Sequence, residues 1–124
     1  MSTIKVDNLQ TTGGAGLYPA RAWINFNGTG TVAIREDGNV SSITDNTLGD
    51  YTVNFATAIT DANYAMSGMC QSYSHTDAGA GVQPILKATS FTASPTLKTT
   101  TQCAVLFGNT NRFDFANNTI IFTR

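Results

Sequence analysis

The chain has 124 residues, which is enough for one folded domain around one hydrophobic core and too few for two. Charged residues make up 12% of it, against a usual share of about 25%, while hydrophobic residues reach an ordinary 41%. A net charge of -1 together with 7 Phe, 4 Tyr and 1 Trp excludes intrinsic disorder. Threonine, asparagine, serine and glycine replace the usual Lys and Glu, so we expect a folded domain with a nearly neutral surface.

The few charges also limit the possible partners. The 7 Lys and Arg residues are scattered between Lys5 and Arg124 and form no basic patch, so we expect no nucleic-acid partner. No apolar run approaches the roughly 18 residues of a membrane span, and the first five residues lack the apolar core of a secretion signal. We therefore expect a soluble protein made in a cytoplasm, without membrane insertion.

The first 16 residues offer little that could be buried. Ile4, Val6 and Leu9 precede the small and flexible run of Thr, Gly and Ala at residues 11–16. We expect residues 1–16 to be an attachment arm with a Gly-rich linker, which becomes ordered only against a partner surface. Ile4, Val6 and Leu9 are the predicted contacts of this arm, and residues 17–124 form the folded domain.

The rest of the chain alternates apolar and polar residues, the period of a half-buried strand. In residues 51–55, for example, Tyr51, Val53 and Phe55 share one face. Similar runs lie at residues 22–26, 31–35, 40–44, 64–70, 84–88, 100–107 and 119–123. The pattern predicts an all-β fold, an antiparallel, jelly-roll-like β-sandwich of about seven or eight short strands connected as a meander.

Turn residues separate these runs. Asp37-Gly38 joins two alternating runs and predicts a hairpin over residues 31–44, and residues 45–50 are expected to form a longer connection. Four aspartates fall at such positions, where a carboxylate can accept hydrogen bonds from backbone amides. They are Asp37, Asp45, Asp50 and Asp61.

The alternation also separates core aromatic residues from one that faces outward. Six aromatic residues are expected to point into the core: Tyr51, Phe55, Phe107, Phe113, Phe115 and Phe122. Ala22, Ile24 and Phe26 form one apolar face, which places Trp23 on the other side of its strand. There Trp23 could pack on the N-terminal arm or on a neighbouring subunit, and we favour packing on a subunit over stacking on a ligand.

The two cysteines show no sign of metal binding. Cys70 and Cys103 lie in separate alternating stretches and form no Cys-x-x-Cys pair. They are expected to be buried free thiols on neighbouring strands, with a disulfide as the open alternative.

No catalytic or cofactor-binding motif is present in the sequence. His75 is the sole histidine, and together with Asp77 it falls in a stretch without periodicity that we expect to be an exposed loop. We expect no enzyme activity, no catalytic residue, no metal site and no cofactor. A glycan-degrading enzyme is the alternative from another class, and it would need a pair of carboxylates such as Asp77 and Asp114.

Four stretches carry a resemblance to a known family: residues 4–11, 16–28, 50–55 and 61–64. Two of them are the more specific, Ala22-Trp23-Ile24-Asn25-Phe26-Asn27-Gly28 and Asp50-Tyr51-Thr52-Val53-Asn54-Phe55. Together they resemble fibre and tail-fibre proteins of tailed bacteriophages, particularly those of marine and cyanobacterial phages.

The resemblance implies a virion structural protein that is assembled in the bacterial cytoplasm. It implies a homotrimer whose arm joins other virion proteins and whose β domain faces the host. Such fibres are usually longer, which leaves a head or tail decoration or an adaptor without receptor binding as the alternative.

The resemblance fixes no receptor site, so side-chain chemistry has to nominate one. Rings, amides and charges in two loops suit a host surface glycan. The candidates are Tyr73, His75, Asp77, Asn109, Asn111 and Arg112.

Overall fold

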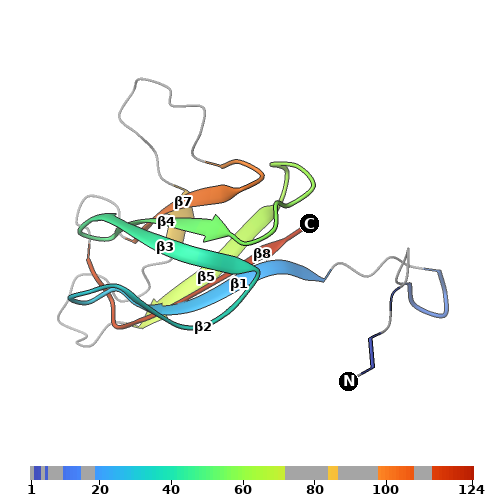
Figure 1. Cartoon of the computed structure of the whole chain (residues 1–124), viewed down its shortest axis with the longest axis horizontal. Coiled ribbons are helices and arrows are strands. Elements are labelled where there is room, and N and C mark those ends of the chain that lie inside the picture. The colour runs from blue at the N-terminus through green and yellow to red at the C-terminus, as the bar shows by residue number, and fades with distance from the viewer. Residues whose placement is uncertain are drawn as a thin grey trace.

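The computed structural model of the chain is a two-layer β-sandwich (Figure 1). It describes residues 2–3, 5, 10–14, 19–71, 98–107 and 113–124, and the backbone of residues 84–86. The described part contains strands and no helix, which confirms the all-β prediction. The strands are β1 Ala20–Asn27, β2 Ala33–Gly38, β3 Val40–Thr47, β4 Asp50–Phe55, β5 Ala65–Gln71, β6 Pro84–Leu86, β7 Gln102–Phe107 and β8 Asn117–Thr123.

The strands form two four-stranded antiparallel sheets, in the orders β2-β1-β8-β5 and β3-β4-β7-β6. The expected meander is therefore wrong, because the first and last strands are neighbours and β4 pairs with β7. Strands that are distant in sequence pair with each other, so each sheet contains segments from both halves of the chain.

The hairpin expected over residues 31–44 is also wrong. β2 and β3 belong to different sheets, and the chain crosses between them at Asn39, which takes a left-handed φ of 58°. The Asn39 side chain fixes this corner, because Nδ2 donates to the carbonyls of Arg21 and Thr57 and Oδ1 accepts the Thr57 amide. The hairpin after the corner joins β3 to β4 at residues 48–49, so the expected long connection at 45–50 is instead mostly strand.

Two groups of edge-to-face rings join the sheets across the core. Phe26 contacts Tyr51 and Phe107 with centroid distances of 5.1 and 5.9 Å. Toward the other end, Phe122 contacts Phe55 and Tyr64 at 5.0 and 5.8 Å. Each group takes rings from both layers, so burial and ring geometry together favour one alignment of the sheets.

The inward aromatic set is confirmed. Its members are buried except Phe113, which is partly buried and packs against the core.

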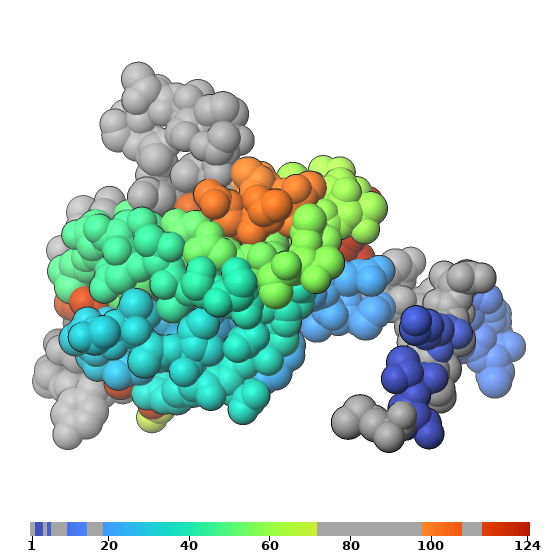
Figure 2. All heavy atoms as spheres, in the orientation of Figure 1, coloured from blue at the N-terminus to red at the C-terminus, as the bar shows by residue number. Residues whose placement is uncertain are grey.

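The two ends of the sandwich carry different segments of the chain. At one end β1 begins and β8 ends, with Ala20 paired to Thr123, and the described residues 10–14 lie beyond this end (Figures 1 and 2). We call this the arm end. At the opposite end, the loop end, lie the turns after Asn27 and Thr47, together with Gln71 and Phe107, the last residues of β5 and β7.

Candidate functional site

The structure describes residues that flank the predicted receptor residues, but not the receptor residues themselves. Tyr73, His75, Asp77, Asn109, Asn111 and Arg112 lie outside the described residues, as do the arm residues Ile4, Val6 and Leu9. Of the predicted site residues, Trp23 alone is described.

The residues that flank both candidate segments are brought together at the loop end. Gln71 precedes residues 72–83 and pairs with Asn117, whose Nδ2 donates to Gln71 Oε1 at 2.8 Å. Pro84 follows that segment and pairs with Phe107, which precedes residues 108–112. The two segments nominated separately from the sequence therefore start and finish at the same end of the sandwich.

The base of residues 108–112 is closed by backbone hydrogen bonds. The Phe113 amide donates to the Phe107 carbonyl at 3.3 Å, and the Phe107 amide donates to the Gly49 carbonyl at 2.8 Å. Gly49 has a φ of 65°, and a Cβ at this position would lie 2.8 Å from the Phe107 carbonyl oxygen. Only glycine fits this close approach without strain, so the β3-β4 turn and the loop base are built as one unit.

Asp114 attaches the loop base to the core. Its Oδ1 accepts the Gly49 amide at 2.7 Å and the Tyr51 hydroxyl at 2.6 Å. The Tyr51 hydroxyl also donates to the Gly28 carbonyl at 3.2 Å, so the phenol links the turn after β1 to Asp114. The carboxylate is thus occupied by structural donors, which does not favour Asp114 as half of a catalytic carboxylate pair.

Burial and Asp114 both act on the Tyr51 phenol. Desolvation, then the hydrogen bond and charge of Asp114, raise the pKa of Tyr51 well above its ordinary value. Tyr51 is therefore a neutral donor at every physiological pH.

Asn118 completes the loop end from the other sheet. Its side chain is fully buried, and Nδ2 donates to the carbonyls of Phe26 and Phe115 at 3.3 and 2.7 Å. Among the described residues, its Oδ1 has no hydrogen-bond partner. Sequence reasoning missed both Asn118 and the role of Asp114, and the polar residue at an inward strand position was the available signal for Asn118.

Trp23 lies on the outer face of β1, as predicted, and is partly buried. It pairs with Gly38 on β2 and with Ile121 on β8. A Cβ at Gly38 would lie 2.3 Å from the indole Nε1, so the missing side chain of Gly38 leaves room for the ring. Trp23 therefore lies on the outer face of the sheet, between β2 and β8.

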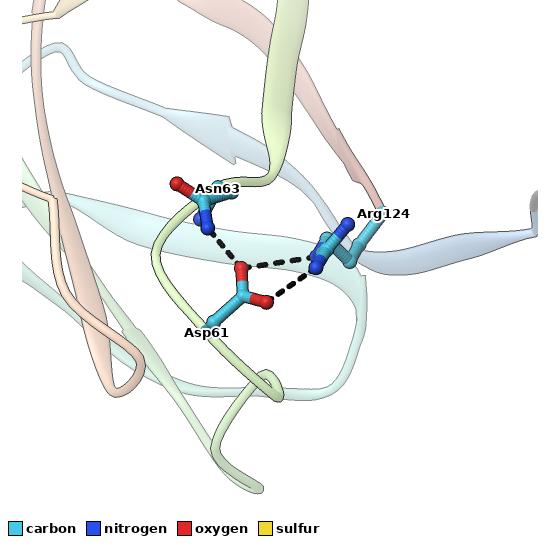
Figure 3. A network of polar contacts seen from close by, with 3 residues as sticks. All are labelled: Asp61, Asn63 and Arg124. Carbon is cyan, nitrogen blue, oxygen red and sulfur yellow. Dashed lines mark hydrogen bonds and ion pairs between the residues drawn. The ribbon is translucent and has the colours of Figure 1, made fainter.

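A second polar cluster lies near the arm end (Figure 3). Asp61 accepts hydrogen bonds from the Asn63 amide at 2.7 Å and from Arg124 Nε at 3.0 Å, and it forms an ion pair with the Arg124 guanidinium. Arg124 first, and then the Asn63 amide, hold the pKa of Asp61 below its ordinary value. The cluster joins the β4-β5 connection to the residue after β8.

The turn-capping predictions hold for two of the four aspartates. Asp61 caps Asn63, and Asp37 Oδ1 accepts the Val40 amide at 3.3 Å. Asp37, Asp45 and Asp50 fall within β2, β3 and β4, and Asp50 accepts a hydrogen bond from Asn46 Nδ2.

No disulfide joins Cys70 and Cys103, as expected, but only Cys103 is buried, Cys70 is partly buried, and the two are not on neighbouring strands. Cys70 lies on β5 and Cys103 on β7, in different sheets. Burial raises the pKa of both thiols, and Tyr64 and Lys98 partly offset the shift at Cys103. These thiols are packing groups.

Among the described residues, no group of three or more His, Cys, Asp and Glu side chains could hold a metal ion. The same residues contain no helix long and apolar enough to cross a membrane.

Comparisons with protein-family models, curated proteins and solved structures found no match to this chain.

Proposed function

We propose that the chain is a structural protein of a bacteriophage virion, forming a trimeric fibre or fibre tip that contributes to host attachment. The observation that carries the proposal is the separation of the two ends. The arm leaves from the end where Ala20 pairs with Thr123, whereas Gln71 and Phe107 lead into the candidate segments at the other end. A fibre tip needs this arrangement, because one end must join the particle while the other faces the host.

The anchoring of the loop end supports the same role. Binding residues are commonly carried by loops on a rigid scaffold. Here Tyr51, Asp114 and Gly49 hold the base of one candidate segment, and Asn117 holds the start of the other. The ring, amides and charges of residues 72–83 and 108–112 are suited to a surface glycan.

A non-enzymatic role fits the carboxylates better than glycan hydrolysis does. Hydrolysis would need two carboxyl groups about 5 to 10 Å apart that are free to act on a sugar. Asp114 already accepts two structural hydrogen bonds, and Asp61 is paired with Arg124.

The experiment is an adsorption assay with the purified chain and the phage that encodes it. We expect the full-length protein to bind host cells and to slow adsorption of the phage. A variant with Tyr73, His75 and Asn109 changed to Ala should lose this effect. A matched variant with Ser41, Thr44 and Thr47 on β3 changed to Ala should retain it.

Absence of binding and of competition, under conditions where intact virions adsorb, contradicts the receptor role. If deletion of residues 1–16 then abolishes incorporation into particles, the chain is a decoration or adaptor.

A further inference from the structure

The outer face of the β2-β1-β8-β5 sheet exposes apolar side chains that the core does not use. Met69 is 69% exposed and Ile121 is 42% exposed. Ile121 lies directly opposite Trp23 on one side and Ser67 on the other, which makes Met69 its diagonal neighbour on β5. We call Trp23, Ile121 and Met69 the lateral patch.

The half of this face formed by β8 and β5 carries no charge. Successive side chains of a strand alternate between faces, and the buried ones identify the inward set. The outward residues are Asn117, Thr119, Ile121 and Thr123 on β8 and Ala65, Ser67, Met69 and Gln71 on β5. A charged side chain of a partner that packed on these residues would lose its hydration and find no opposite charge.

The outer face of β3 and β4 differs, because its amides and hydroxyls bind one another. Asn54 Nδ2 donates to Ser42 Oγ and Thr44 Oγ1 at 3.0 and 3.1 Å. Asn46 Nδ2 donates to Thr52 Oγ1 at 3.0 Å. This polar face suits contact with water, in contrast to the lateral patch.

We propose that the lateral patch is the surface through which copies of this chain associate, patch against patch, around an axis parallel to the length of the sandwich. The partner must present an uncharged surface, and a chain with 12% charged residues supplies one on the same face. Such an axis keeps all arms at one end and all loop ends at the other. In this respect the inference rests on the proposed function.

The regular backbone of β5 and β8 supports close packing at this face. The two strands pair over seven consecutive positions without a register shift. β5 contains no charged residue, proline or bulge, so its outward side chains form a regular and uncharged row.

The test compares the sedimentation of the full-length chain with that of Met69→Glu and Ile121→Glu. Both side chains are exposed, so the folded protomer should tolerate either charge, and far-UV circular dichroism checks this. The wild type should sediment as an oligomer and both variants as the 13.1 kDa monomer. Leu48→Glu is the matched control, because Leu48 is 54% exposed at the β3-β4 turn, away from the patch, and should behave as wild type.

A second readout does not depend on disrupting the contact. Because the same residue of neighbouring copies meets near the axis, oxidation of Ile121→Cys should give a cross-linked dimer that Leu48→Cys does not give. Folded variants that keep the wild-type mass overturn the lateral patch while leaving the trimeric fibre intact. A monomeric wild type overturns the association itself, whereas the adsorption assay tests the attachment role separately.

Discussion

The Tyr51 hydroxyl donates to Asp114 Oδ1 at 2.6 Å across 63 positions of sequence. The same carboxylate accepts the Gly49 amide, so one side chain serves a core strand and a turn together. This contact ties Asp114, two residues beyond the segment 108–112, to the core.

Asp114→Ala should therefore destabilise the fold. It leaves the Tyr51 hydroxyl with only the longer Gly28 contact and the Gly49 amide without its acceptor, and we expect a loss of about 2 kcal/mol in the free energy of unfolding. Urea denaturation measures it. Thr44→Ala, which removes an exposed hydrogen bond, is the control and should cost less than about 0.5 kcal/mol. Equal effects of the two substitutions would contradict the anchoring role.

Stability should fall in alkaline solution because two buried tyrosines stay protonated in the folded chain. Burial raises the pKa of both Tyr51 and Tyr64 well above the ordinary value. Above pH of about 10 the unfolded chain loses these protons while the folded chain keeps them, so unfolding is favoured as pH rises. The free energy of unfolding should fall by about 1.4 kcal/mol per pH unit for each tyrosine.

Urea denaturation between pH 9 and 11 measures this slope, and Tyr51→Phe should reduce it by half. A slope that is unchanged in Tyr51→Phe would show that this phenol ionises in the folded protein.

Gly38→Ala should displace the indole of Trp23. The added methyl group would lie 2.3 Å from Nε1, so the ring must move outward at a cost of about 1–3 kcal/mol. Because Trp23 is the single tryptophan of the chain, its fluorescence emission should shift to longer wavelength. Ala33→Ser, at an exposed position on the same strand, should leave the spectrum unchanged. An unshifted spectrum in Gly38→Ala would mean that the indole does not lie over β2.

Arg124→Gln should raise the pKa of Asp61 toward its ordinary value, because the guanidinium is the main cause of its depression. With a lowered pKa in the folded state, this contact contributes stability above the ordinary carboxyl pKa and loses it as pH falls through the folded pKa. Titration of the carboxyl carbon by NMR measures the change, with Arg35→Gln as the control. An unaltered Asp61 titration in Arg124→Gln would show that the exposed pair is not formed in solution.

The strands were predictable because their cause is local. Tyr51, Val53 and Phe55 alternate with polar residues, and a two-residue period marks a half-buried strand wherever it occurs. The pairing was not predictable in the same way. Asp37-Gly38 has the composition of a hairpin turn, but the positive φ falls on Asn39, whose side chain binds Arg21 and Thr57 and directs β3 into the other sheet.

The site was predictable only in part for a similar reason. The lack of periodicity identified residues 74–82 as a loop, and a second loop was expected around Asn109, Asn111 and Arg112, but nothing local indicates that both begin and end at the same place. That follows from the pairing of Gln71 with Asn117 and of Pro84 with Phe107. Asp114 shows no local signal either, because its partners Gly49 and Tyr51 are far away in the sequence.

The native mass of the full-length chain by light scattering tests the trimeric fibre most directly. A trimer, three times the 13.1 kDa of one chain, gives about 39 kDa and agrees with an assembly that presents its loop ends together. A mass of 13.1 kDa contradicts the trimer.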